Sequence, residues 1–430
     1  MKGYQFEDTQ GTFHLKKAEN ISYLYFPIAG EAGLKSSLTP NLGGDAKIDQ
    51  NTFLLEPVSA ENLVNNRNSR NFWCNVKGIG SWSLTGNAAE ALSKKFTEMQ
   101  DDSEVTAGFM WQKTTRESKK YQLRGEILSF IPVEKNVEVM LVTITNTGRM
   151  AQTVTPTAAI PLYGRSADNI RDHRHVTSLL HRIETTDIGV LVTPTLSFDE
   201  RGHQVNHMTY YCVGWSGNGE KPVDFYPTAE DFVGEGGNFE RPYAIVKNAE
   251  GVKAGTRIEG LEAVGGLHFS EVTLEPEEEC SYLIFTGITE DIQEIRNLSK
   301  TYTTREMVLE ELEKTKAYWQ EKVNVAYHTG DSDFNQFMHW VSFQPILRRI
   351  YGCSFLPHHD YGKGGRGWRD LWQDCLALLI MNPDGVRQML LDNFAGVRVD
   401  GSNATIIGSK QGEFVADRNH ITRVWMDHGV

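Results

Sequence analysis

The sequence predicts an α+β protein of several domains, in which an antiparallel β-sandwich is followed by a helical part. Short runs with apolar residues at every second position recur between Gly, Asn, Asp and Pro residues up to about residue 288. From about residue 289 the apolar spacing becomes that of α-helices. A chain of 430 residues is long enough for two or three domains. We therefore expect a sandwich at 1–288, a helical linker at 289–328 and a second helical domain at 329–430.

The strand predictions rest on alternating runs that end at turn residues. The clearest strand is expected at 137–148, where the run closes at Asn146-Thr147-Gly148. Others are expected at 122–131, 189–196, 208–215 and 279–286. Parallel strands need crossover helices, and helical patterns are scarce in this part of the sequence. The strands should therefore pair antiparallel in packed sheets, most simply a large β-sandwich.

The helical part begins with two long helices. Thr303 and Glu306 predict a capping box at the start of a helix that runs to about Val323. Its buried stripe should consist of Val308, Leu312, Thr315, Trp319 and Val323. Ser332 or Asp333 is expected to cap the next helix. The residues available for the buried face of that helix are Phe334, Phe337, Met338, Val341 and Ile346.

Two further helices are expected at about 369–381 and 384–394, flanked by polar stretches that contain several glycines. These stretches, 352–367 and 395–413, are long for connections within a compact domain, which makes them candidates for function. The second stretch is expected to form the mouth of the helical domain, and a plain surface connection is the alternative.

Charge and cysteine usage limit the functional class. A net charge of −13 argues against DNA or RNA as the partner, because phosphate backbones are bound by excess Lys and Arg. No apolar run approaches the roughly 18 residues that span a bilayer, and the N-terminus is polar where a signal peptide is apolar. The five cysteines are widely spread without a Cys-x-x-Cys pair, which favours a reducing compartment. We expect a cytoplasmic protein with no membrane or nucleic-acid partner.

Residues 362–374 are the most informative for chemistry. A glycine-rich loop here runs into a predicted helix, whose first N–H groups and positive dipole end suit an anion. Arg366, with Lys363 as the competitor, adds positive charge, and a guanidinium grips phosphate with two parallel hydrogen bonds. The sequence therefore predicts a phosphate site at this loop.

The helix that follows has one polar and one apolar side. Asp370, Gln373 and Asp374 share a face by their i, i+3, i+4 spacing, and Arg369 lies beside them. The apolar side should contain Leu371, Cys375, Leu378 and Leu379.

Trp368 and Trp372, four residues apart, lie along one edge of this helix. Carboxylates, a guanidinium and an amide beside indole rings are what a pyranose needs, because its hydroxyls require polar partners and its C–H face packs on an aromatic ring. The candidate substrate-binding residues are Trp368, Arg369, Asp370, Gln373 and Asp374. A solvated surface helix is the alternative interpretation of the same pattern.

Two histidine segments resemble metal-ligand pairs. These are Asp172-His173-Arg174-His175 and His358-His359-Asp360. A His-x-His on a strand points both rings to one side, which suits a metal, but no third and fourth ligands stand out in the sequence. We therefore assign no metal, and a substrate-lining role of His358 and His359 remains open.

Nearly the whole chain resembles the N-terminal part of inverting glycoside phosphorylases of the cellobiose and chitobiose phosphorylase type, a group similar to glycosyl hydrolase family 94. The residues that carry the resemblance are Phe343-Gln344, the segment Trp368 to Asp374, and the loop Asp231 to Gly237. The resemblance implies a supersandwich, a helical linker and the start of an (α/α)6 barrel that is truncated at Val430.

The resemblance also implies a reaction. Inorganic phosphate, as co-substrate, would attack the anomeric carbon of a β-linked glucoside with inversion and release α-glucose 1-phosphate, without a cofactor. Arg369 and Asp370 would hold the hydroxyls of the glucosyl unit, and Arg366 or Lys363 the phosphate. Such an enzyme is expected to form a homodimer.

The catalytic general acid of this family is an Asp in a Trp-Asn-Asp-Gly type motif, which does not occur up to Val430. It is expected beyond that residue, so we name no catalytic residue and expect this fragment to be inactive by itself. The alternatives are a glycosyltransferase or hydrolase on the same fold, or a non-catalytic carbohydrate-binding sandwich. The sequence does not indicate the linkage or the chain length of the glucan.

Overall fold

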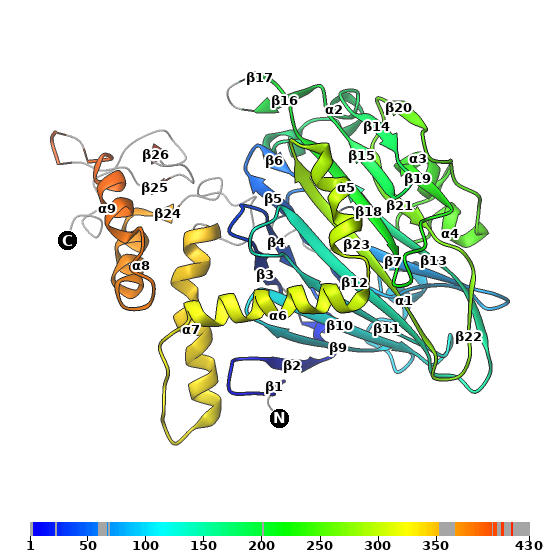
Figure 1. Ribbon diagram of the computed structural model, residues 1–430, viewed down its shortest axis with the longest axis horizontal. Helices are drawn as coiled ribbons and strands as arrows, with labels where there is room; N and C mark the ends of the chain where they lie inside the picture. Colours follow the sequence, from blue (N-terminus) through cyan, green and yellow to red (C-terminus); the bar gives the residue numbers. More distant parts are fainter. Residues whose placement is uncertain are drawn as a thin grey trace.

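The computed structural model describes residues 3–21, 24–58, 67, 69–199, 202–351, 366–397, 399–401, 406–407 and 414–415. Two large antiparallel sheets pack face to face, and helices cover their outer sides (Figure 1). A helical part, coloured yellow to orange, extends from one end of this sandwich. The antiparallel sandwich predicted for the first part of the chain is confirmed.

Eleven of the described strands form the larger sheet, and neighbouring strands in it are antiparallel. Across the sheet they follow the order β1 (Tyr4–Phe6), β2 (Phe13–Lys16), β9 (Asp102–Gly108), β10 (Trp111–Ser118), β11 (Leu123–Phe130), β12 (Val137–Asn146), β23 (Glu279–Thr289), β18 (Thr209–Ser216), β15 (Gly189–Val192), β14 (Arg182–Thr185) and β20 (Arg257–Glu259). Four of the predicted strands are therefore present as β11, β12, β18 and β23. The strand predicted at 189–196 ends earlier, at Val192.

Six further strands form the second large sheet. Its order is β19 (Asp224–Thr228), β21 (Ala263–His268), β13 (Gln152–Leu162), β7 (Asn71–Val76) and β8 (Gly80–Ser83), with β22 (Val272–Leu274) also paired to β13. The smaller sheets are β3 (Phe26–Ala29), β4 (Lys35–Leu38), β5 (Ala46–Asp49) and β6 (Thr52–Phe53), then β16 (Leu196–Asp199) and β17 (Gly202–Val205), and finally β24 (Arg366–Gly367), β25 (Ile406–Ile407) and β26 (Phe414–Val415).

Strand β12 shows why the two sheets pack as they do. All of its residues are buried, because both faces of the larger sheet are covered. Met140 and Val142 point into the core between the two sheets. Val139 and Leu141 point to the other face, where they pack in a second core under helices. The period of two therefore places alternate residues in two different cores.

Two helices cover the outer face of the larger sheet, α5 (Ile292–Thr301) and α6 (Arg305–Lys322). The predicted stripe of α6, from Val308 to Val323, is buried as expected. The second sheet is covered by α3 (Ala229–Val233) and α4 (Tyr243–Lys247). The remaining short helices are α1 (Ala89–Lys94) and α2 (Arg174–Ser178), with single 3-10 turns at Ala18–Asn20 and Ala167–Arg171.

The helical part consists of α7 (Ser332–Tyr351), α8 (Trp368–Met381) and α9 (Val386–Phe394). It shares one core with the sandwich, because Phe109 of the sandwich and Trp319 of α6 both pack on Phe343 of α7. Close to it, the Trp340 indole donates a hydrogen bond of 2.8 Å to the carbonyl oxygen of Gly11. Gly11 has a φ of +87°, which favours glycine at this close approach.

Both predicted N-caps are wrong, by one or two residues. Thr304 caps α6, its side chain makes no capping hydrogen bond, and the Thr303 hydroxyl instead donates to Met307 Sδ. Asp331 caps α7, because its Oδ1 accepts a 3.1 Å hydrogen bond from the Phe334 amide. Helix ends depend on local geometry that the residue types alone leave open by a residue or two.

The buried face predicted for α7 is also wrong. Phe334, Phe337 and Val341 are exposed, and Met338 is half-buried. Of the predicted face only Ile346 is buried. The residues that do pack in the shared core are Phe343, Ile346, Leu347 and Tyr351. Because α7 has apolar residues on most of its sides, the periodicity did not identify the face that contacts the sandwich.

Within the described residues no helix combines the length and the apolar character needed to cross a membrane.

Candidate functional site

Helix α8, which was predicted to carry the site, is anchored to α7 by its apolar side. Leu371, Cys375 and Leu378 are buried in the shared core, as predicted. Leu379 was expected on the same side, but 53% of it is exposed. Its position, one residue past Leu378, turns it away from α7. The buried stripe of α8 is therefore narrower than the sequence indicated.

Asp374 is the most constrained of the predicted site residues. Only 1% of it is exposed, and Arg348 Nε of α7 donates to both of its carboxylate oxygens at 2.8 Å. A second guanidinium nitrogen of Arg348 also forms an ion pair with it. Asp374 thus faces α7 and fixes the rotation of α8 about its axis. Of its predicted neighbours on the polar face, Gln373 is exposed and Asp370 is half-buried.

A short strand directly precedes α8. Arg366 and Gly367 form β24, and α8 begins at the next residue, Trp368. Strand β24 pairs with β25, in the register Arg366 with Ile407, and β25 pairs with β26. Ile406 and Ile407, which belong to the 395–413 stretch, are therefore joined by their backbone to the strand that contains Arg366.

Several predicted residues are only partly covered by the structure. Lys363, His358 and His359 lie outside the described residues. For Arg366, Trp368 and Arg369 the backbone is placed in β24 and α8, and their side chains are outside the described part of the chain. What the structure brings together is thus the backbone of Arg366, the first turn of α8 and Asp370.

The C-terminal end of α7 is held by the small sheet of β3 and β4. Lys35 Nζ donates a 2.7 Å hydrogen bond to the carbonyl oxygen of Ile350, and a cation is favourable at a helix C-terminus. Burial lowers the pKa of Lys35 to about 8, although the Asp49 and Asp45 carboxylates oppose this shift. The hydroxyl of Tyr351 lies 2.7 Å from two backbone carbonyl oxygens of the same small sheet.

Buried charges join this small sheet to the larger one. Arg70 and Glu138 are both about 1% exposed and form an ion pair, in which Arg70 Nη2 donates to Glu138 Oε2 at 3.0 Å. The Ser36 hydroxyl donates to the same oxygen at 2.6 Å. Nearby, burial raises the pKa of Asp45 and lowers that of Lys47. These side chains fix the position of the small sheet and with it the end of α7.

This architecture can now be compared with known protein families. The glycosyl hydrolase 94 supersandwich domain matches residues 58–305, more than half of the chain. This chain belongs to the glycosyl hydrolase 94 family. The family resemblance inferred from the sequence is thereby confirmed.

Membership of the glycosyl hydrolase 94 family agrees with one curated relative. Cyclic β-(1,2)-glucan synthase NdvB from Rhizobium meliloti (strain 1021) is 27% identical over 203 residues, which are 44% of this chain and 6% of that protein. The chain therefore spans a small part of that relative's length.

Two solved structures are weakly similar to this family member. A bacterial glucoamylase in complex with acarbose is 10% identical, with a TM-score of 0.49 over 95% of this chain and 52% of that chain. A polysaccharide lyase is also 10% identical, with a TM-score of 0.31 over 64% of this chain and 34% of that chain.

Sequence reasoning missed Arg348, Lys35 and the Arg70–Glu138 pair, which position the helical part of this glycosyl hydrolase 94 chain. Their partners lie between 26 and 315 residues away in the sequence, so no local pattern identified them. The histidines at 173 and 175 are exposed and flank the start of the short helix α2 instead of lying on a strand. Among the described residues there is no group of three or more His, Cys, Asp or Glu side chains placed to hold a metal.

Proposed function

We propose that this chain supplies the supersandwich and the first catalytic helices of an inverting glycoside phosphorylase. The substrate is a β-linked glucoside, and the product of its reaction with inorganic phosphate is α-glucose 1-phosphate. The observation that carries the proposal is the β24–α8 junction, where Arg366 lies two residues before the start of α8 and Asp370 lies in its first turn. Family membership supports a glycan as substrate.

The phosphate is bound at the start of α8. The first N–H groups of a helix have no partner within the helix and carry the positive end of its dipole, which favours an anion. Arg366 adds two parallel hydrogen bonds to phosphate oxygens, and Lys363 is the alternative cation. Because phosphate is already an anion, it needs no protein base to act as the nucleophile.

The glucosyl unit is bound along the polar side of α8. Arg369 and Asp370 hold its hydroxyls, with Trp368 and Gln373 beside them. Asp374 acts indirectly, because its ion pair with Arg348 fixes the helix that carries the other residues. A phosphate oxygen attacks the anomeric carbon while the glycosidic C–O bond breaks, and a general acid protonates the leaving oxygen. None of the residues named here is assigned as that acid.

The second candidate is glycosyl transfer, which the similarity to cyclic β-(1,2)-glucan synthase favours. In that reaction a sugar hydroxyl takes the place of phosphate as the acceptor. The two reactions differ in one measurable respect, because only phosphorolysis consumes phosphate and forms α-glucose 1-phosphate.

Binding to the chain itself tests the phosphate site. Isothermal titration of the 430-residue chain with inorganic phosphate and with α-glucose 1-phosphate should show saturable binding. The Arg366→Ala variant should bind at least about tenfold more weakly, because a charged hydrogen bond contributes about 1.5–3 kcal/mol. The matched control is Arg387→Ala on the exposed side of α9, which should bind like the wild type. Equal binding by all three proteins, or none by the wild type, would contradict the phosphate site.

Turnover distinguishes the two candidate reactions. The whole gene product is incubated with β-1,2-, β-1,3- and β-1,4-linked glucobioses, with and without phosphate, and followed by phosphorus NMR. Phosphorolysis requires the appearance of α-glucose 1-phosphate. Sugar transfer at the same rate without phosphate supports the second candidate instead.

A further inference from the structure

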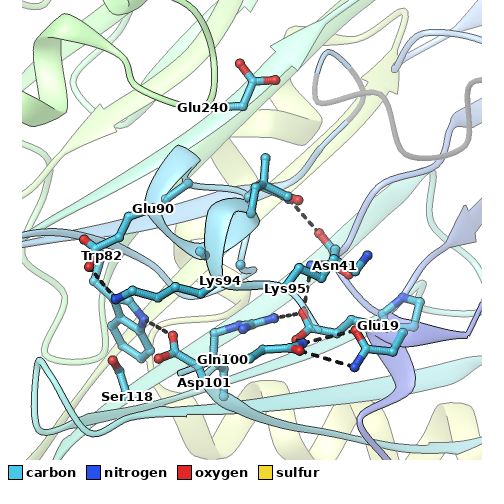
Figure 2. Close-up of a pocket in the computed structure, with 18 of the residues that line it drawn as sticks. Glu19, Asn41, Trp82, Glu90, Lys94, Lys95, Gln100, Asp101, Ser118 and Glu240 are labelled. Carbon is cyan, nitrogen blue, oxygen red and sulfur yellow. Dashed lines mark hydrogen bonds and ion pairs between the residues drawn. The ribbon is translucent and has the colours of Figure 1, made fainter. Parts of the chain in front are cut away.

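The sandwich contains a cavity that the proposed active site does not use. It has a volume of about 410 Å³ and lies beside α1, β8 and β10 (Figure 2). In Figure 1 α1 and α8 are on opposite sides of the molecule. The volume is in the range of small-molecule pockets, roughly 300–1,000 Å³. Its apolar lining includes Ile21, Leu24, Ala91, Leu92 and Phe96.

One polar wall of the cavity is built around Glu19. Only 5% of its side chain is exposed, and it forms an ion pair with Arg116. The Gln100 amide donates to one carboxylate oxygen of Glu19, and Asn41 Nδ2 donates to the other at 3.2 Å (Figure 2). Burial alone would raise the pKa of Glu19, but the Arg116 charge and these hydrogen bonds outweigh it and lower the pKa. The carboxylate is therefore a fixed, ionised acceptor.

The second polar wall of the cavity also consists of side chains that are hydrogen-bonded to one another. The Trp82 indole donates a 3.0 Å hydrogen bond to Asp101 Oδ2. Glu90, at the same wall, accepts hydrogen bonds of 2.6 Å from Lys94 and 2.8 Å from Lys120. The positive and negative groups of both walls are thus largely paired with each other. A cavity that carries little net charge favours a neutral ligand over an anion.

The rim carries an exposed aromatic ring in an unusual backbone conformation. Phe96 is 75% exposed, and its φ of +65° lies in the left-handed region that bulky residues rarely adopt. Its amide is held by a 2.9 Å hydrogen bond to Gln100 Oε1, so the same Gln100 that contacts Glu19 also positions this ring. Strained residues of this kind concentrate at ligand sites, where the surrounding structure holds them.

Lys95 lies beside this ring. Its Nζ is 5.3 Å from the centroid of the Phe96 ring. Within the described part of the chain, the Lys95 ammonium has no hydrogen bond or ion pair, which leaves its three donors available. The rim therefore offers an exposed aromatic face next to unused hydrogen-bond donors.

We propose that this cavity is a second saccharide site, which holds a sugar unit of a β-glucan chain away from the β24–α8 junction. The C–H face of the pyranose packs on the Phe96 ring and the apolar side chains beside it. The hydroxyls accept hydrogen bonds from Lys95 and donate to the fixed carboxylates. The identity of the glycan as a glucan rests on the proposed function, whereas the site itself rests on the cavity.

The test measures saccharide binding with the proposed active site removed. Arg369→Ala is introduced into the full chain, and this protein is titrated calorimetrically with β-1,2-, β-1,3- and β-1,4-linked gluco-hexasaccharides. We expect saturable binding of at least one of them. Adding Phe96→Gly, which suits the left-handed conformation and so preserves the fold, should weaken that binding at least tenfold.

Two further variants test whether saccharide binding depends on the Phe96 ring and on the Lys95 side chain. Phe96→Trp keeps an aromatic face and should retain binding, and Lys95→Ala should weaken it several-fold. The matched control is Met99→Ala, which alters an equally exposed apolar side chain of the same loop that does not line the cavity. Its affinity should equal that of the Arg369→Ala protein.

The outcomes for the two sites are distinguishable. If the hexasaccharides bind equally well with and without Phe96→Gly, or none binds at all, the second site is overturned. That result leaves the phosphate titration of the Arg366 variant unaffected. If instead α-glucose 1-phosphate fails to bind the wild type while Phe96-dependent saccharide binding persists, the proposed reaction fails and the second site stands.

Discussion

Arg348 and Asp374 join α7 to α8 through two hydrogen bonds of 2.8 Å from one guanidinium nitrogen to both carboxylate oxygens. The carboxylate is buried, whereas 36% of the Arg348 side chain remains exposed. Every other residue assigned to the site on α8 depends on the orientation that this pair gives to the helix.

Removing the carboxylate should destabilise the helical part. Asp374→Ala removes the buried carboxylate that Arg348 contacts, and because Arg348 is partly hydrated the loss of unfolding free energy should be about 1–3 kcal/mol. Hydrogen exchange measured by mass spectrometry should show faster exchange in peptides from α7 and α8. Asp384→Ala, at an exposed position between α8 and α9, is the control and should change neither quantity. Unchanged exchange in the Asp374 variant would contradict the anchoring role.

Two phenylalanines of α7 should differ sharply in their contribution to stability. Phe343 is fully buried, with its ring centroid 4.6 Å from that of Phe109, whereas Phe337 is 55% exposed. Phe343→Ala should lower the free energy of unfolding by about 3–5 kcal/mol. Phe337→Ala should change it by less than about 0.5 kcal/mol. Urea unfolding of both variants measures the difference, and equal losses would mean that α7 buries the other face.

The strands of the larger sheet and helices α6, α7 and α8 show which features the sequence predicted and which it did not. Period-two runs predicted β11, β12, β18 and β23, and the stripe of α6 was predicted because its opposite side is charged. On α7 the apolar residues surround the helix, so only the contact with Phe109 decides which side is buried. On α8 the spacing placed Asp374 on a polar face, yet its partner Arg348 comes from another helix and could not be inferred from spacing.

Acid should weaken the fold through His181. Burial, and then the positive charge of Arg165, lower the pKa of this fully buried imidazole from 6.5 to about 3. As the pH falls below about 6.5 the unfolded chain takes up a proton that the folded chain excludes, so stability is lost progressively toward pH 3.

The matching experiment compares wild type with His181→Gln by urea unfolding at pH about 7 and about 5. The wild type should lose up to about 1.4 kcal/mol more per pH unit than the variant. His203→Gln, at an exposed position, should follow the wild type. Parallel loss of stability in wild type and the His181 variant would exclude this source of acid sensitivity.

The assignment of Asp370 to a sugar hydroxyl predicts a measurable loss of affinity. Asp370→Asn keeps the size of the side chain and removes its charge, so α-glucose 1-phosphate should bind about tenfold to a hundredfold more weakly. Inorganic phosphate, which has no sugar hydroxyls, should bind as it does to the wild type. Titration calorimetry measures both ligands, and a parallel loss of both would contradict a role of Asp370 confined to the sugar hydroxyls. Asp392→Asn on α9 is the control.

Phe109, Trp319 and Phe343 pack in one core, so the part of the chain that packs together extends beyond the residues that the family match covers. The family match ends at residue 305, where α6 begins, and a chain cut there would keep α5 but lose α6, one of the two helices that cover the larger sheet. It would lose Val308 and Leu312 from the core that contains Val139 and Leu141, and the apolar surface left behind would favour aggregation. Experiments therefore need the sandwich and the helices that follow it in one chain, because each part covers apolar side chains of the other.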